Sequence, residues 1–141
     1  MMRVMYSFEN SSDYSSFLFS LEDKFPEIEN SQINFFSIEP DLFLVKGAIE
    51  FNSEIKLTFH EVINFSKQRI VRYAYEVYRK NELLYFYDPQ EHPDDSNLAS
   101  TFPHHKHIHP NIKRNRQPAP GISFTKPNLL FLIQEIIDQF L

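Results

Sequence analysis

The strongest constraint on the fold is a stretch, residues 33–88, in which apolar and polar residues alternate. Successive side chains of a β-strand point to opposite faces, so a period of two predicts strands with one apolar face. Short polar turns divide the stretch at residues 52–53, 66–69 and 79–82. Turns of this length join neighbouring strands as hairpins. The sequence therefore predicts an antiparallel meander of four to five strands over residues 32–88.

The apolar face of the predicted strands contains one carboxylate. The residues in this register are Phe43, Val45, Gly47, Ile49, Phe51, Ile55, Leu57, Phe59, Glu61, Ile63, Phe65, Tyr73, Tyr75, Val77, Tyr85 and Tyr87. If Glu61 is buried, it must be paired or have a raised pKa. A β-bulge that turns Glu61 to solvent is the alternative. The pattern leaves both open.

Two helices are predicted, one before and one after the predicted strands in the sequence. The first covers residues 12–25, is capped by Ser11 or Ser12, and ends at Pro26. The second covers residues 127–140. Their apolar stripes are Tyr14, Phe17, Leu18, Leu21 and Phe25 in the first, and Leu129, Leu132, Ile133, Ile136, Ile137 and Phe140 in the second. These elements predict an α+β fold, with both helices packed on the sheet. Further apolar residues at 130, 131 and 141 lie off the second stripe, as expected for a homodimer or a partner complex.

Composition narrows the class of protein. A chain of 141 residues is predicted to form a single domain, residues 1–141. It has no cysteine, which excludes disulfides, thiolate catalysis and cysteine-bound zinc. The chain has only two glycines and nine prolines, so we expect turns that need positive φ either to use Asn or Asp or to be avoided. With no signal-peptide pattern and no apolar run long enough for a bilayer, we expect a soluble, cytoplasmic protein that does not bind membranes.

The histidines are concentrated in one short segment. Residues 102–110 read FPHHKHIHP and hold four of the six histidines in the chain. They lie in a predicted loop, residues 89–121, and within a longer stretch, residues 96–134, that contains no Asp or Glu. A long loop that gathers titratable side chains indicates a functional site.

One interpretation of the segment is a metal site. In an extended conformation His105, His107 and His109 point the same way, and three imidazoles suit zinc. Consecutive alternate residues seldom converge on one ion without help, and His60 or His92 would have to complete the site. No carboxylate lies nearby in the sequence. We therefore expect neither a metal nor another cofactor.

Acid–base chemistry on RNA fits the residues better. RNA supplies its own nucleophile, the 2′-hydroxyl, so a small protein needs only a base, an acid and cations. His105 and His107 are the predicted acid–base pair, and Lys106 and Arg72 the predicted phosphate binders. The other predicted catalytic or supporting residues are His104, Tyr75, Glu61 and Asp88. Predicted RNA-binding residues are Lys106, Lys113, Arg114, Arg116, Tyr73 and Tyr87. The alternative is a non-catalytic module whose histidine loop binds a partner or nucleic acid.

Several of these motifs occur together in a known family. They are Arg72-Tyr73-Ala74-Tyr75, Tyr85-Phe86-Tyr87-Asp88, Glu91-His92-Pro93, and Phe102-Pro103-His104-His105-Lys106-His107. This set resembles the TumE family of bacterial type II toxin–antitoxin systems, and Glu61 resembles a strand glutamate of that family. The last motif is the most specific. The chain departs from the family pattern at Phe86, Pro89 and Glu91, where Arg, Asn and His are usual.

The resemblance implies a growth-inhibiting toxin that a small helix-turn-helix antitoxin neutralises. If the family arginine that Phe86 replaces binds phosphate, Arg72 or Lys106 must take over that role here. The resemblance does not identify the molecular target. RNA as the substrate is therefore an inference from the histidines.

Overall fold

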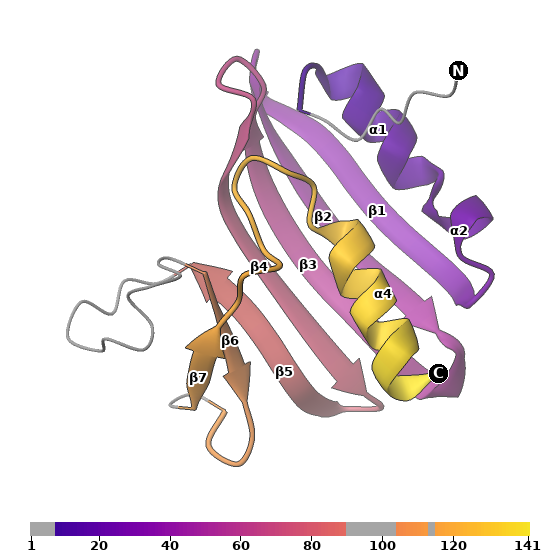
Figure 1. The fold of residues 1–141 in the computed structure, drawn as a ribbon. Helices are drawn as coiled ribbons and strands as arrows, with labels where there is room; N and C mark the ends of the chain where they lie inside the picture. The colour runs from indigo at the N-terminus through magenta and orange to yellow at the C-terminus, as the bar shows by residue number, and fades with distance from the viewer. Residues whose placement is uncertain (1–7, 90–103, 113–114) are drawn as a thin grey trace.

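The computed structural model describes residues 8–89, 104–112 and 115–141. The described chain is an α+β fold built on one seven-stranded antiparallel sheet, in which the strands follow one another in chain order (Figure 1). The strands are β1 Ile28–Glu39, β2 Leu42–Phe51, β3 Ile55–Asn64, β4 Arg69–Arg79, β5 Glu82–Pro89, β6 His104–Ile108 and β7 Arg116–Pro118. The predicted α+β class and the antiparallel meander are confirmed.

The predicted number of strands, four to five, is wrong. The additional strands β6 and β7 lie in the segment that we expected to be a loop, residues 89–121. The sequence of β6 is His-His-Lys-His-Ile, which lacks the apolar alternation of a half-buried strand. Pairing with β5 and polar contacts hold this strand in the sheet instead.

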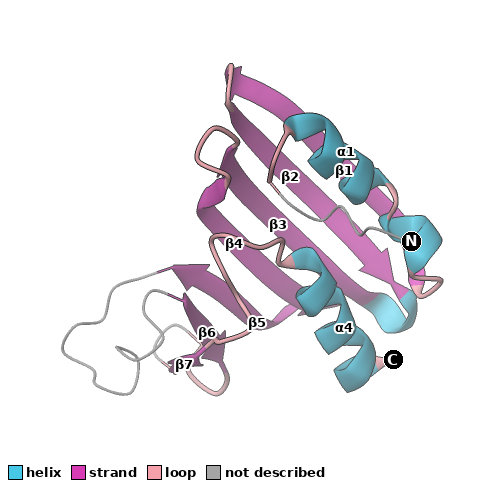
Figure 2. Ribbon diagram, turned by 45° about the horizontal axis from the view of Figure 1, so that its top comes forward, coloured by secondary structure: helices cyan, strands magenta, loops and turns pink. Residues whose placement is uncertain are grey.

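The helices differ in detail from the prediction. Those before and after the strands lie on one face of the sheet (Figure 2), and a short 3-10 helix, η1 Asn52–Glu54, joins β2 to β3. The expected helix 12–25 is two pieces, α1 Ser11–Phe19 and α2 Leu21–Lys24. Asn10, rather than Ser11 or Ser12, caps α1, because its side chain accepts a hydrogen bond from the Asp13 amide at 2.8 Å. The last helix, α4 Leu129–Phe140, begins two residues later than expected.

Positive φ angles fall on residues that composition did not predict. They occur at Ser53, Glu54, Gln68 and Lys80, in the turns between strands, and neither glycine adopts one. Gly47 is needed for close packing instead, because an added Cβ would lie 2.5 Å from the ring of Phe59. Glycine therefore creates space within the sheet, and the turns accept a strain of about 1 kcal/mol per residue.

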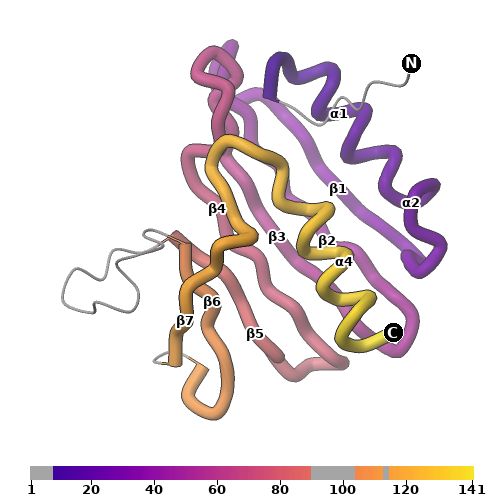
Figure 3. The backbone as a smooth tube through the Cα atoms, in the orientation of Figure 1, coloured from indigo at the N-terminus to yellow at the C-terminus, as the bar shows by residue number. Residues whose placement is uncertain are grey.

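The hydrophobic core lies between the helices and the sheet, on the side that we name the helical face. The predicted apolar face of the strands points there, with Val45, Leu57, Ile63 and Val77 fully buried. The tube in Figure 3 shows the first and last helices over this same face. The opposite side is named the reverse face. The fold therefore presents two faces, and each strand divides its side chains between them.

Candidate functional site on strand β6

Strand β6 divides the histidine motif between the two faces of the sheet. Lys106 pairs with Tyr87 of β5 and contacts α4, so it lies on the helical face. His104 contacts Tyr73 on that face as well. By alternation His105 and His107 lie on the reverse face, where their partners in β5 are Asp88 and Phe86. The two predicted catalytic histidines thus share a face, while the predicted phosphate binder Lys106 lies on the other.

On the reverse face, both ring nitrogens of His107 lie within hydrogen-bond distance of protein oxygens. Its Nε2 lies 2.9 Å from Asp88 Oδ1 and its Nδ1 lies 3.1 Å from the Ile112 carbonyl. Each ring nitrogen therefore has a protein oxygen as its neighbour. The ring also stacks on Phe86 with centroids 4.1 Å apart. His107 is 3% exposed and His105 0% exposed. Both imidazoles are therefore positioned inside the folded chain.

On the helical face, Lys106 forms an ion pair with α4. Its Nζ lies 3.1 Å from Glu135 Oε2, and the two side chains are 12% and 14% exposed. The Tyr87 hydroxyl donates to the same carboxylate at 2.8 Å, and the Lys106 ammonium lies 4.1 Å from the centre of the Tyr85 ring. Glu135 therefore neutralises the charge that we expected to bind phosphate.

His104 is the most exposed of the three histidines in β6. Its side chain is half-buried, and its Nδ1 lies 2.5 Å from the Tyr73 hydroxyl. Either group can be the donor, depending on the tautomer of the ring. Burial, and then the charge of His105, lower the pKa of His104 from its ordinary value. Burial and the charge of Asp88 raise the pKa of Tyr73, so its hydroxyl keeps its proton. His104 is thus favoured as a neutral imidazole.

A cation and an aromatic ring lie beside His104. The Phe124 ring is 4.7 Å from the His104 ring between centroids, and the Arg69 guanidinium lies 4.8 Å from the centre of Phe124. Arg69 is exposed at the start of β4. A phosphate that reached His104 would therefore have a guanidinium within the same cluster.

Glu61 is buried, which is the first of the two alternatives that the sequence left open. The bulge between β3 and β4 comes after Val62, so Glu61 stays in the inward register. Its two oxygens accept hydrogen bonds from Tyr14 and Tyr75, each at 2.5 Å, and Asn128 donates to the Tyr75 hydroxyl at 3.0 Å. Desolvation raises the pKa of Glu61, while the two hydroxyl hydrogen bonds act in the opposite direction. This network fastens α1 and the start of α4 to the sheet.

The remaining predicted site residues are dispersed. Arg72 is exposed on the reverse face of β4. Arg116, in β7, is half-buried and pairs with His107 of β6. Tyr73 and Tyr87 are 1% and 2% exposed, which leaves no ring face for a base to stack on. Lys113 and Arg114, together with residues 91–93, 102 and 103 of the family motifs, lie outside the described residues.

Several residues in these contacts were not predicted as site residues, among them Tyr14, Arg69, Phe124, Asn128 and Glu135. Glu135 carried a signal, since it is a carboxylate next to Ile136 in a strongly apolar helix. Tyr14 carried a weaker one, because its hydroxyl falls in an otherwise apolar stripe. The sequence contains no comparable signal for the other three.

The described residues contain neither a group of metal ligands nor a membrane-spanning helix. No group of three or more histidine, aspartate or glutamate side chains within residues 8–89, 104–112 and 115–141 is placed to hold a metal ion. In the same part of the chain, none of the helices has the length and apolar character needed to cross a membrane.

Comparison with known proteins gives one match. The family model described as Toxin TumE matches residues 18–140, which is nearly the whole chain. The match includes all of β6 and the residues that contact its side chains, which together we name the β6 cluster. No curated protein matched, and no solved structure matched.

Proposed function

Since the chain belongs to the TumE toxin family, we propose that it is the toxin of a toxin–antitoxin pair and cleaves RNA without a metal, with His104 as the proton-transfer residue. Membership of a toxin family implies an antitoxin partner. The observation that carries the chemistry is the half-buried His104 beside the Tyr73 hydroxyl.

The state of His104 suits a general base. A lowered pKa keeps the imidazole neutral near pH 7, when it can accept a proton. If Nδ1 donates to the Tyr73 oxygen, Nε2 carries the lone pair that takes the proton of the ribose 2′-hydroxyl. The 2′-oxygen then bonds to phosphorus, the bond from phosphorus to the 5′-oxygen breaks, and the leaving oxygen takes a proton from water. The hydroxide that remains takes the proton from the His104 imidazolium, which restores the neutral base. Arg69, close by through Phe124, stabilises the charge on the phosphate.

This assignment revises the pair inferred from sequence. His105 and His107 are buried, and His107 has both ring nitrogens bound to protein oxygens. We assign them positioning roles: His107 fastens β6 to Asp88, and the charge of His105 helps to keep His104 neutral. Lys106 likewise fastens β6 to α4 through Glu135.

The second candidate is a non-catalytic binding module, and one observation favours it. The same burial of His105 and His107 makes them candidates for a purely structural motif that shapes a binding surface. The variant His104→Ala distinguishes the two candidates. A ribonuclease should lose both RNA cleavage and toxicity in this variant, whereas a binding module, which cleaves no RNA, should keep its toxicity.

The test is cleavage of a fluorescently labelled RNA by the purified protein in excess EDTA, with growth arrest as a second readout. We expect cleavage, a loss of about 100-fold or more in His104→Ala, and no loss in the control His109→Ala, whose exposed ring binds only the Leu83 carbonyl among the contacts described. Intact RNA from a protein that still arrests growth would contradict the ribonuclease. Equal cleavage by His104→Ala would contradict the assignment of the base.

A further inference from the structure

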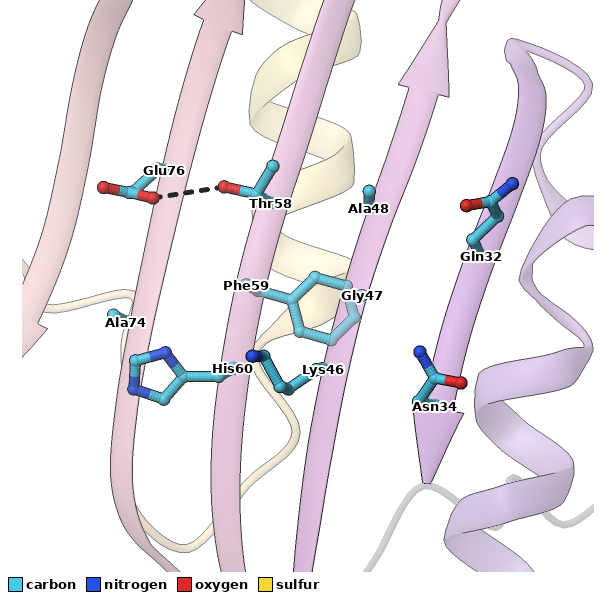
Figure 4. A pocket seen from close by; sticks show the side chains of 10 residues that line it. All are labelled: Gln32, Asn34, Lys46, Gly47, Ala48, Thr58, Phe59, His60, Ala74 and Glu76. Atoms are coloured by element: carbon cyan, nitrogen blue, oxygen red, sulfur yellow. Dashed lines mark hydrogen bonds between the residues drawn. The ribbon is translucent and has the colours of Figure 1, made fainter. Parts of the chain in front are cut away.

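The reverse face carries a hollow that is separate from the β6 cluster. It has a volume of about 450 Å³ and crosses strands β1 to β4, and Figure 4 shows the side chains that line it. On the reverse face the lining residues Ala48 and Ala74 have small side chains, which leave the space above the strands open. A volume of this size falls within the range of small-ligand sites.

One end of the hollow is basic. Lys46 pairs with His60 across strands β2 and β3, and Arg72 is two residues along β4 from Ala74, the other neighbour of His60. Burial lowers the pKa of His60, and the charges of Arg72 and Lys46 lower it further, as expected for three basic side chains close together. The charge of Glu76 raises the pKa of His60 and is the last of these four causes in size. An anion bound among them would relieve this repulsion.

Among the described residues that line the hollow, the one carboxylate lies at the other end. Glu76 accepts a hydrogen bond from the Thr58 hydroxyl at 3.2 Å, and Figure 4 shows this pair away from Lys46 and His60. Along the β1 side are two exposed amides, Gln32 and Asn34. Amides of this kind form paired hydrogen bonds with the edges of nucleic-acid bases. The hollow thus has a cationic end and an amide-lined side.

We propose that this hollow holds one nucleotide of single-stranded RNA, with its phosphate against Lys46, His60 and Arg72 and its base edge against Gln32 and Asn34. The inference rests on the proposed action on RNA. It adds a binding site distinct from His104, because Arg72 and Ala74 alternate with Tyr73 and so face the opposite side of β4.

The test is the fluorescence anisotropy of a labelled 2′-O-methyl oligouridine, which binds like RNA but lacks the hydroxyl needed for cleavage. We expect Lys46→Gln and Arg72→Gln each to weaken binding about tenfold, which corresponds roughly to the loss of one charge-assisted hydrogen bond. Each should also reduce the salt dependence of binding by about 0.7 in the logarithmic slope. The matched control is Lys56→Gln. Lys56 lies on the same strand as His60, but it does not line the hollow, and its ammonium is 5.9 Å from the centre of the Tyr78 ring.

Each outcome decides the proposal. It stands if Lys46→Gln and Arg72→Gln weaken binding and Lys56→Gln does not, even if ordinary RNA is never cleaved, in which case only the ribonuclease is lost. It is overturned if the oligonucleotide does not bind, or if all three variants bind like the unmodified protein. It is also overturned if Lys46→Gln spares RNA binding and weakens the complex with an antitoxin, because the hollow then belongs to a protein partner. Chemical-shift changes at Gln32 and Asn34 on adding uridine monophosphate provide a check that needs no variant.

Discussion

The hydroxyl of Tyr14 donates a hydrogen bond to Glu61 at 2.5 Å, and both residues are fully buried. Tyr14 lies on α1 and Glu61 on β3, so this contact joins the first helix to the middle of the sheet. Tyr75 provides the matching contact from β4, at the same distance. The buried carboxylate is therefore stabilised by hydroxyl groups from two separate elements.

Removing the Tyr14 hydroxyl should destabilise the fold. Tyr14→Phe keeps the ring and leaves Glu61 with one donor fewer, so the free energy of unfolding should fall by about 2 kcal/mol. Urea denaturation followed by circular dichroism measures this change. The control is Tyr78→Phe on the reverse face, for which we expect a change below about 0.5 kcal/mol. If the two variants lower the free energy of unfolding equally, the buried contact between Tyr14 and Glu61 does not stabilise the fold more than an ordinary tyrosine hydroxyl does.

Glu61 should make stability depend on pH. Its pKa is raised in the folded state by desolvation, so the folded chain holds a proton that the unfolded chain has released. The stability contributed by this proton is complete below the unfolded value of 4.5 and is lost as the pH rises through the folded pKa. The slope cannot exceed about 1.4 kcal/mol per pH unit for one group. Glu61→Gln should remove this part of the slope in urea denaturation from pH 4.5 upward, and an unchanged slope would contradict the assignment.

The contact between Lys106 and Glu135 should matter for stability more than for RNA binding. Glu135→Ala leaves the Lys106 ammonium nearly buried without its carboxylate, and we expect a loss of about 2 kcal/mol in the free energy of unfolding. A double-mutant cycle with Lys106→Met isolates the coupling. The exposed Gln139→Ala on the same helix serves as the control. If Lys106→Met weakens RNA binding tenfold and leaves stability unchanged, Lys106 is a phosphate binder after all.

Tyr73→Phe should reduce the rate of RNA cleavage without affecting substrate binding. The hydroxyl orients the His104 ring, so its loss should lower kcat by about tenfold or more and leave KM unchanged. In the unmodified protein the rate should fall as the pH drops through the lowered pKa of His104, because the base must be neutral. In Tyr73→Phe this acidic limb should move, which a purely structural role would not explain. A rise in KM alone would argue for a binding role.

The fold was predictable where one face of a strand is apolar. Alternation in residues 43–88 sets the register, because a slip by one residue would bury the polar face. Strand β6 could not be found in this way, since its buried residues are His105 and His107. Their burial depends on the pairing with β5, which the pattern of a single strand does not contain.

The sequence indicated candidate site residues, but it did not indicate the contacts that they make. The motif and Asp88 were identified, and the structure joins His107 to Asp88. The sequence could not show that Glu135, 29 residues from Lys106, neutralises it. Nor could it show that Tyr73 binds His104 rather than a base. These contacts depend on how α4 and β4 pack, and packing between distant segments is not encoded in local spacing.

The chain-order sheet has a consequence for synthesis on the ribosome. Every strand pairs with the one made just before it, so the sheet can grow one hairpin at a time as the polypeptide emerges. The helical face stays incompletely covered during this growth, because α4 and the Asn128 contact to Tyr75 come from the last segment of this chain. The nascent protein therefore lacks its finished core until residues 128–140 have emerged. For a toxin, this order delays the active conformation until almost all of this sequence has been translated.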